Sequence, residues 1–326
     1  MAQMNMIEAI RDAIGTAMST DERVVVLGQD VGKMGGVFRA TDGLLAKFGD
    51  KRVFDMPLAE GAIVGSALGL ALSGLRPIAE IQFLGFTQQA CHQIIQQVAR
   101  MRYRSRGRYA ASLVIRAPFG GGGRTPELHS DAIESQFTQA QGLKIIAPSN
   151  SYDAKGMLLS AVRDPDPVLF LEPLHGYRSI KGEVPPTDYE VEIEKVRIAR
   201  EGKDVTLIAW SAAVNLALEA AEVLAGEGIS AGVVDIRSLL PLDVDGLVAA
   251  VEQTGRCVII HEAPLTGGFG AEIAATISKE AFYSLQAPIE RVTAPDAPYP
   301  LAAAEKMFVP NFGQVAAAVR RTLEAE

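Results

Sequence analysis

Short apolar runs that alternate with helical segments are the feature that most restricts the fold of this chain. Val24–Leu27 is fully apolar and stops at Gly28, as a buried parallel strand does. Residues 5–19 carry apolar side chains at helical spacing, and Asn5 and Glu8 are placed to form a capping box. Further strands are expected at residues 77–83, 112–116, 143–147, 168–172, 205–210, 231–236 and 257–261, and helices at 60–73, 87–103, 152–163, 212–226 and 270–279. This alternation predicts an α/β fold with parallel sheets covered by helices on both faces.

One stretch interrupts the alternation. From about residue 181 to 200 the chain becomes charged, loses its long apolar runs and contains Pro185-Pro186. Such composition is typical of a linker between domains. We therefore expect an α/β domain over residues 1–185, a linker over 186–200 and a second α/β domain over 201–326, and 326 residues are enough for two cores.

Charge and cysteine content exclude several classes of protein. Lys and Arg number 31 against 39 Asp and Glu, a net charge of −8, which argues against nucleic-acid binding. The two cysteines, Cys91 and Cys257, match no metal-ligand spacing, and a reducing cytoplasm suits them best. The N-terminal segment carries charges among its apolar residues, so neither a signal peptide nor a membrane anchor is expected.

Loops that follow strands are where ligands bind in open parallel sheets, and Glu60 lies in one of them. It stands at the start of an expected helix, where the helix dipole favours a carboxylate by a few tenths of a kcal/mol. The alternative is a carboxyl group in an apolar setting with a raised pKa, able to share a proton with a ligand. The residues alone leave both interpretations open.

A glycine run, Gly120–Gly123, follows another expected strand and leads to His129. Four glycines allow a backbone to approach a ligand closely or to move. The run matches neither the dinucleotide fingerprint nor the phosphate-binding loop. His129 is either a structural histidine or an acid–base group, and its place after a flexible run favours the second role.

Two charged segments have ordinary explanations. Arginines stand at every second position from Arg100 to Arg108, which fits a helix C-terminus or a subunit interface with ion pairs better than a nucleic-acid patch. Asp164 and Asp166 share a tight turn that either ligates a hard cation or is a solvated corner. Residues alone thus give an α/β protein with a candidate carboxyl-plus-histidine site, but not a reaction.

Motifs along nearly the whole chain resemble one family. They are Gly28-Gln29-Asp30-Val31-Gly32, Gly35-Gly36-Val37-Phe38-Arg39, Pro57-Leu58-Ala59-Glu60, Ala79-Glu80-Ile81-Gln82-Phe83, Arg102-Tyr103-Arg104-Ser105, Thr125-Pro126-Glu127-Leu128-His129-Ser130, Tyr152-Asp153-Ala154-Lys155-Gly156, Asp235-Ile236-Arg237-Ser238-Leu239 and Arg291-Val292-Thr293. Together they resemble the beta subunits of the thiamine diphosphate-dependent, decarboxylating component of 2-oxoacid dehydrogenase complexes. The segment around His129 is most similar to bacterial pyruvate dehydrogenase beta subunits, which favours pyruvate over branched-chain 2-oxoacids or acetoin.

The resemblance implies a pyrimidine-binding domain followed by a transketolase C-terminal-type domain. It further implies an alpha2-beta2 heterotetramer with thiamine diphosphate at each alpha–beta interface. The Gly-Asp-Gly signature that holds magnesium and diphosphate is missing, since Phe48-Gly49-Asp50-Lys51 lacks the second glycine. We therefore expect the alpha subunit to bind magnesium and the phosphate half of the cofactor, and the chain to be inactive alone.

The resemblance also assigns roles to single residues. Glu60 would hydrogen-bond the pyrimidine ring nitrogen, so that the cofactor's imino group can remove the thiazolium carbon-2 proton. Phe86 would lie against the pyrimidine, with Leu58 and Gln82 beside it. His129 would orient the 2-oxoacid or transfer protons as the acyl group passes to lipoamide, a role worth about 10²–10⁴ in rate.

Other implied contacts lie outside the reaction. A structural potassium ion would be held by Ala111, Leu113, Val114, Ala161, Asp164 and Asp166, the first four through backbone carbonyls. The second domain would form beta–beta contacts and dock the peripheral subunit-binding domain of the acyltransferase core, whose lipoyl domain takes the acyl group. Its segment Gly267-Gly268-Phe269-Gly270-Ala271-Glu272 is best explained as a helix start with glycines for close packing. A non-catalytic docking subunit is the alternative from another class.

Overall fold

A computed structural model describes residues 1–125, 127–301 and 303–325, and the chain divides into two compact units. Unit 1 comprises residues 1–119 and 136–193, and unit 2 comprises residues 120–135 and 194–326. The division after Ile193 falls inside the segment expected as a linker. The short segment 120–135, which contains the glycine run and His129, belongs to the compact unit formed by the C-terminal half.

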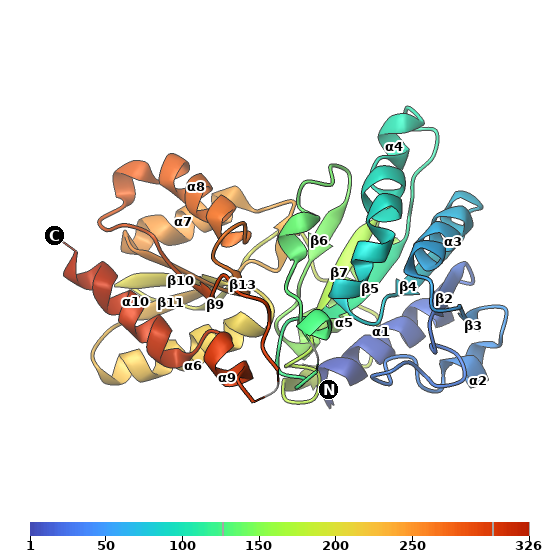
Figure 1. Cartoon of the computed structure of the whole chain (residues 1–326), viewed down its shortest axis with the longest axis horizontal. Helices are drawn as coiled ribbons and strands as arrows, with labels where there is room; N and C mark the ends of the chain where they lie inside the picture. Colours follow the sequence, from blue (N-terminus) through green and yellow to red (C-terminus); the bar gives the residue numbers. More distant parts are fainter. Residues whose placement is uncertain (126, 302, 326) are drawn as a thin grey trace. The chain divides into compact units, whose positions relative to one another are not determined.

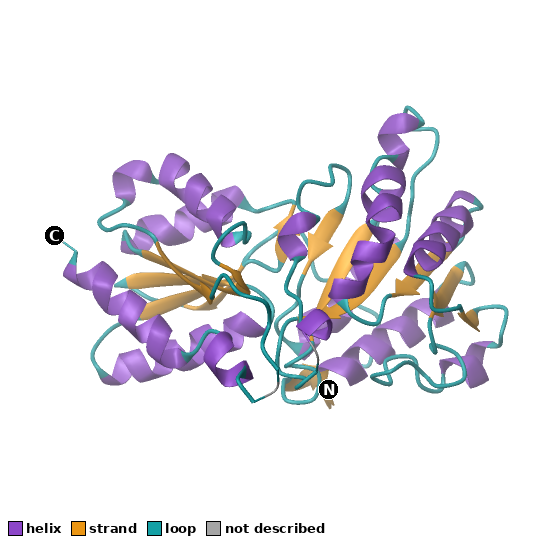
Figure 2. Ribbon diagram, viewed as in Figure 1, coloured by secondary structure: helices purple, strands orange, loops and turns teal. Residues whose placement is uncertain are grey.

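Unit 1 is built around a sheet of parallel strands in the order β6-β7-β5-β4-β2-β3 (labelled in Figure 1). Figure 2 shows strands in orange and helices in purple. Their bounds are β2 (Val24–Gly28), β3 (Val53–Asp55), β4 (Arg76–Glu80), β5 (Val114–Phe119), β6 (Lys144–Ile146) and β7 (Val168–Pro173). Every residue of β2, β5 and β7 is buried, as parallel strands covered on both faces require. A separate antiparallel pair joins β1 (Ala2–Asn5) to β8 (Lys181–Val184).

Helices of unit 1 cover both faces of this sheet. They are α1 (Met6–Thr20), α2 (Leu44–Phe48), α3 (Glu60–Leu72), α4 (Met101–Arg104) and α5 (Ser151–Arg163), with the short helical turns η1 (Leu84–Ala90) and η2 (His92–Val98). Two further single turns are η3 (Glu127–His129), which belongs to unit 2, and η4 (Glu134–Gln136), where the chain passes back to unit 1. Helix α1 packs against α5, and α3 packs against η1 and η2 (Figure 1). The capping box predicted at Asn5 and Glu8 is confirmed, with hydrogen bonds of 2.8 and 3.0 Å.

Unit 2 holds a second sheet in the order β14-β13-β10-β11-β9, parallel except for β9. The strands of this sheet are β9 (Arg197–Arg200), β10 (Val205–Ala209), β11 (Ala231–Asp235), β13 (Cys257–Pro264) and β14 (Glu290–Ala294). The short strand β12 (Ser238–Leu240) of unit 2 is not part of it. Helices α6 (Ala212–Gly226) and α10 (Phe312–Glu324) pack together on one face, and α7 (Val244–Thr254) and α8 (Gly270–Glu280) on the other (Figure 1). The short helices α9 (Glu305–Phe308) and η5 (Phe282–Ser284) complete this unit.

Each unit has its own hydrophobic core. In unit 1, α1 and α5 bury their apolar faces against the sheet strands. In unit 2, the alanine-rich α6 and the amphipathic α10 pack on β10, β11 and β13. Two independent cores around two mostly parallel sheets confirm the predicted two-domain α/β architecture. Within the described residues, no helix is both long and apolar enough to cross a bilayer.

The structure corrects the element predictions at four places. The strand expected at residues 77–83 runs from Arg76 to Glu80. The helix expected over residues 87–103 is three consecutive pieces, η1, a wider π-helical turn η2 and α4. The strand expected at 112–116 begins at Val114 and continues to Phe119. The charged segment between residues 181 and 200 is not strandless, because β8 and β9 each add an edge pairing through backbone hydrogen bonds that polar residues make as readily as apolar ones.

Candidate functional site

Three adjacent strands of unit 1 end at the same level of the sheet. Gly28 at the end of β2 is in register with Asp55 at the end of β3 and with Glu80 at the end of β4. Residues that follow these positions therefore emerge at one carboxyl edge, which is where open parallel sheets bind ligands. Glu60 and the segment 82–86 both follow these strands, so the sheet topology places the residues predicted to bind the cofactor at one edge.

Glu60 is the first residue of α3 and is only 8% exposed. Its carboxyl group forms no hydrogen bond or ion pair with the described residues, yet its oxygens are not sealed from solvent. A mostly buried polar group without an internal partner is rare in folded proteins and calls for an explanation. The N-terminus of α3 favours a negative charge there only weakly. The arrangement leaves the carboxyl group available to a ligand.

The segment that holds Phe86 lies directly against the first turn of α3. A methyl group on Gly61 would lie 3.3 Å from the backbone oxygen of Gln89, so the two backbones approach closely. Phe86 lies in the same turn, η1, and its backbone N–H donates to the backbone carbonyl of Phe83 at 3.0 Å. The ring of Phe86 meets the ring of Phe83 edge to face, with centroids 5.3 Å apart. The Phe83–Phe86 pair thus belongs to the segment that packs against α3, the helix that Glu60 begins.

The remaining predicted residues of this edge have different surroundings. Gln82 is partly buried between β4 and η1. Leu58 is 72% exposed, an apolar side chain that nothing in the described chain covers. An exposed leucine next to a buried, unpartnered carboxyl group suits a surface that a cofactor or a second chain covers.

A buried ionic network under this edge was missed by the sequence analysis. Arg116 on β5 donates Nε and Nη2 to Glu172 on β7, both at 2.7 Å, and Nη1 to Glu80 on β4. Tyr177 donates its hydroxyl to Glu172 as well. Burial lowers the pKa of Arg116, but the carboxylates of Glu172 and Glu80 outweigh burial and the net shift is upward. Burial also raises the pKa of Glu80.

This network supports the aromatic side of the site. The ring of Tyr177 packs on Phe38 with centroids 5.2 Å apart, and Phe38 packs on Phe83 at 5.5 Å. Phe83 in turn contacts Phe86. A continuous row of rings therefore joins the buried ion pairs to Phe86. One charged residue within each of three neighbouring apolar runs was the sequence signal that could have revealed the network.

His129 belongs to unit 2, at the end of the single turn η3, and is partly buried. The chain around it folds back on itself: the Gly120 N–H donates to the Asp131 oxygen at 3.4 Å, and the hydroxyls of Thr125 and Ser130 lie 3.0 Å apart. Pro126 of the predicted motif lies outside the described residues. The two predicted catalytic residues thus lie on different elements. Glu60 lies at the sheet edge of unit 1, and His129 lies in a loop of unit 2.

The predicted potassium site has its carboxylates occupied. Asp164 accepts from Lys144 Nζ at 2.8 Å, and Asp166 accepts from Arg102 Nε at 2.5 Å. Both carboxylates are thus already paired with a cationic side chain, and the Leu113 carbonyl already accepts the Val168 N–H at 3.0 Å. The oxygens present still fit a potassium ion, because a carboxylate and a carbonyl each accept at more than one position, and the assignment stays a prediction. Among the described residues, no three His, Cys, Asp or Glu side chains come together as a metal site.

Two other sequence features have structural roles. Arg102 and Arg104 lie in the last turn of α4, as the helix-terminus interpretation expected, and Arg104 donates to Gln97 Oε1 at 2.6 Å. Gly268 and Gly270 pack so closely on His261 that a methyl group on either would collide with its ring. The prediction of a helix start with glycines for close packing is confirmed.

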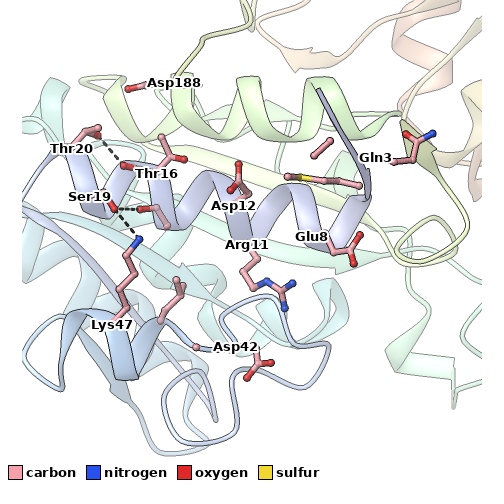
Figure 3. A pocket seen from close by; sticks show the side chains of 15 residues that line it. Gln3, Glu8, Arg11, Asp12, Thr16, Ser19, Thr20, Asp42, Lys47 and Asp188 are labelled. Atoms are coloured by element: carbon pink, nitrogen blue, oxygen red, sulfur yellow. Dashed lines mark hydrogen bonds between the residues drawn. The ribbon is translucent and has the colours of Figure 1, made fainter. Parts of the chain in front are cut away.

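A broad hollow along α1 is not part of the site. It has a volume of about 770 Å³ and contains none of the predicted site residues (Figure 3). Its side chains carry both signs of charge, and some are already engaged: Glu8 in the capping box, and Lys47 with Ser19 at 3.3 Å. Nothing there converges on one ligand chemistry.

Comparison with known proteins agrees with this architecture. Residues 2–179 match the family described as the transketolase pyrimidine-binding domain, and residues 194–315 match the transketolase C-terminal domain. A solved structure titled "Split gene transketolase, inactive beta4 tetramer" superposes with a TM-score of 0.81 at 29% identity, covering 99% of both chains. The fold and the carboxyl edge of its first sheet thus define a transketolase-like, thiamine diphosphate-type protein.

Full-length relatives narrow the class. Pyruvate dehydrogenase E1 component subunit beta of Bacillus subtilis (strain 168) is 50% identical over 324 residues, which is 99% of this chain and all of the relative. The subunit of the same name from Staphylococcus aureus (strain Mu50 / ATCC 700699) is 47% identical over the same shares. The chain belongs to the transketolase-like family and, within it, to the pyruvate dehydrogenase E1 beta subunits. The resemblance found in the sequence motifs is confirmed.

Proposed function

We propose that this chain is the catalytic beta half of a thiamine diphosphate-dependent pyruvate dehydrogenase and is active only with an alpha subunit. One observation carries the proposal: the carboxyl group of Glu60 is mostly buried, has no partner among the described residues and lies where α3 meets the turn that holds Phe86. These donors and faces fit an aminopyrimidine, which offers a ring nitrogen to a carboxyl group and a flat face to an aromatic ring.

In this proposal, Glu60 would hydrogen-bond the pyrimidine ring nitrogen through its carboxyl group. Phe86, which packs on the row of rings behind it, would offer its face to the pyrimidine. When bound, thiamine diphosphate supplies the carbanion chemistry of decarboxylation. His129 on its loop orients the 2-oxoacid or moves a proton as the acyl group leaves for lipoamide.

We propose that partner chains supply the parts of the cofactor site that this chain lacks. We assign magnesium and the diphosphate to the alpha subunit of an alpha2-beta2 tetramer, because this sequence has no Gly-Asp-Gly signature. The exposed Leu58 beside the site supports coverage by that subunit. A neighbour whose title describes an inactive beta4 tetramer supports the expectation that beta chains alone are inactive. The peripheral subunit-binding and lipoyl domains of the acyltransferase core are the further partners we propose.

Reconstitution tests the proposal. The chain should be inactive alone and should decarboxylate a 2-oxoacid once its alpha subunit, thiamine diphosphate and magnesium are added. Pyruvate should be preferred over 3-methyl-2-oxobutanoate and acetoin, as the names of the relatives suggest. Discrimination by one or two methylenes is worth about 1–3 kcal/mol, so preferences of roughly ten- to hundredfold are expected.

The same assay separates the alternatives. Preference for 3-methyl-2-oxobutanoate or acetoin would keep the enzyme class and change the substrate. Wild-type activity of complexes carrying Glu60→Ala or His129→Ala would instead indicate a non-catalytic docking subunit. Continued inactivity of a correctly assembled wild-type tetramer with all three substrates would contradict the proposal.

A further inference from the structure

The loop that carries His129 has almost no regular structure of its own. Between β5 and η4, the described residues form only the single turn η3. Gly120, Gly122 and Arg124 all have positive φ, at 80°, 94° and 52°, so the chain here is built for sharp turns. A histidine that must point consistently at a substrate therefore needs an external support for its loop.

Two carboxylates of unit 2 supply that support. Glu262 on β13 accepts the backbone N–H of Gly121 at 2.9 Å, and Glu305 at the start of α9 accepts the backbone N–H of Arg124 at 3.1 Å. They therefore hold both ends of the glycine run. The fit is close, because a methyl group on Gly120 would collide with the Glu262 carboxylate.

Neither carboxylate is explained by charge pairing. Glu305 is 7% exposed and Glu262 is partly buried, and neither forms an ion pair with a described residue. A carboxylate buried without a cation is costly unless its hydrogen bonds compensate. What Glu262 and Glu305 gain is the pair of backbone donors from the loop.

We propose that Glu262 is a positioning residue, which fixes the glycine run through the Gly121 N–H and so sets the place of His129, with Glu305 securing the far end. The loop support stands on the hydrogen bonds above. Its consequence for catalysis rests on the proposed function of His129.

The protonation state of Glu262 should tune this support. Burial raises the pKa of Glu262 to about 7, with Glu134 and Glu305 adding to the rise and the Gly121 N–H opposing it. Backbone donors bind an ionised carboxylate more tightly than a neutral carboxyl group. The loop should therefore be held more firmly as the pH rises through 7.

Other titratable groups around Glu262 behave differently. Burial raises the pKa of Glu134 to about 7, and it also raises that of Asp131 and that of Tyr299. Burial lowers the pKa of His261, its neighbour on β13, to about 4, so that ring stays neutral near pH 7. Because Glu134 contributes to the raised pKa of Glu262, Glu134→Gln should lower the pH at which the loop becomes held more firmly, without abolishing the effect.

As the pH rises, the loop amides should become better protected from hydrogen exchange, whereas the free energy of unfolding of the whole fold should fall. A carboxyl group whose pKa is raised on folding contributes stability below its unfolded value of 4.5, and this contribution is lost as the pH rises through about 7. Ionisation of Glu262 thus tightens the loop while it lowers the stability of the fold. A side chain with a purely structural role would move both in the same direction.

Amide hydrogen exchange of the full chain tests the proposal. Exchange of residues 120–125, corrected for the intrinsic rate, should slow about ten- to hundredfold between pH 6 and 8.5 in the wild type, the size expected for one bond to a charged acceptor. Glu262→Gln reproduces the protonated form, so its loop should exchange fast at both pH values. Glu252→Gln removes the same charge from an exposed site on α7 and should behave like the wild type.

Equal loop protection in Glu262→Gln and wild type at every pH would overturn the proposal. Should Glu262→Gln fail to fold, Glu305→Gln tests the other end, where faster exchange is expected around Arg124 and unchanged exchange would count against the support. In the reconstituted wild-type tetramer, kcat should rise as the pH passes through about 7, because the loop is then held more firmly. Glu262→Gln should lower kcat several-fold and remove that pH dependence. An inactive wild-type tetramer would refute the proposed function, whereas the exchange result would still decide the loop support.

Discussion

Removal of Arg116 should destabilise unit 1 far more than its single charge suggests. Arg116 is 1% exposed and holds two carboxylates that are themselves buried, Glu172 at 0% and Glu80 at 4%. Arg116→Met keeps an unbranched apolar stem but removes the guanidinium, so it leaves both carboxylates without a cation. Loss of one partner from a buried ion pair costs about 3–5 kcal/mol, so we expect the free energy of unfolding to fall by about that amount.

Urea unfolding followed by far-ultraviolet circular dichroism measures this change. Arg102→Met is the matched control, because Arg102 pairs with Asp166 at the surface and such pairs contribute about 0–1 kcal/mol. The triple variant Arg116→Met/Glu80→Gln/Glu172→Gln removes the uncompensated charges and should recover much of the loss. A single variant within about 1 kcal/mol of wild type, or a triple variant no better than the single one, would refute the reasoning.

Three further predictions concern groups with separate roles. Burial raises the pKa of Glu134 to about 7, so the contribution of its protonated form to stability is lost as the pH rises through 7. Glu134→Gln should therefore raise the free energy of unfolding by roughly 1–3 kcal/mol at pH 8.5 and leave it nearly unchanged at pH 5. Equal effects at both pH values would contradict this prediction. Phe86→Ala should weaken thiamine diphosphate binding to the reconstituted tetramer about three- to tenfold by calorimetry, the share of one aromatic contact, and unchanged affinity would exclude Phe86 from the site. If backbone carbonyls hold potassium, replacing it with lithium should lower the melting temperature by about 2–4 °C in wild type and in Asp166→Asn alike, and no difference between the cations would end that assignment.

Much of the architecture could be predicted because hydrophobic periodicity reports burial directly. The apolar run at residues 24–27 is a fully buried strand, and the helix that begins at Glu60 was predicted at its first residue. The loop that holds Gln82 and Phe86 also followed from the strand predicted before it, because loops after parallel strands emerge at one edge of the sheet. The strand β3 (Val53–Asp55) that precedes Glu60 was not predicted.

Long-range polar contacts could not be predicted in the same way. Glu262 and Gly121 are 141 positions apart, and nothing near either residue indicates that they meet. The Arg116 network is intermediate, because a charge in each of three apolar strands is visible in the sequence but the strand order that brings them together is not. The turn η2 was missed for a different reason, since an apolar pattern of this length does not distinguish a π-helical turn from an α-helix.

The central claim is that the carboxyl group at position 60 holds a proton on the cofactor's pyrimidine. Exchange of the thiazolium carbon-2 proton with solvent, followed by proton NMR in the reconstituted tetramer before substrate is added, measures that role directly. Glu60→Gln keeps the size of the side chain, and the Glu60 carboxyl group forms no hydrogen bond or ion pair with the described residues, so the fold should be retained. We predict that this exchange slows by about 10²–10⁴ in Glu60→Gln, the usual contribution of an acid–base group. Exchange at the wild-type rate in a variant that still binds the cofactor would contradict the account.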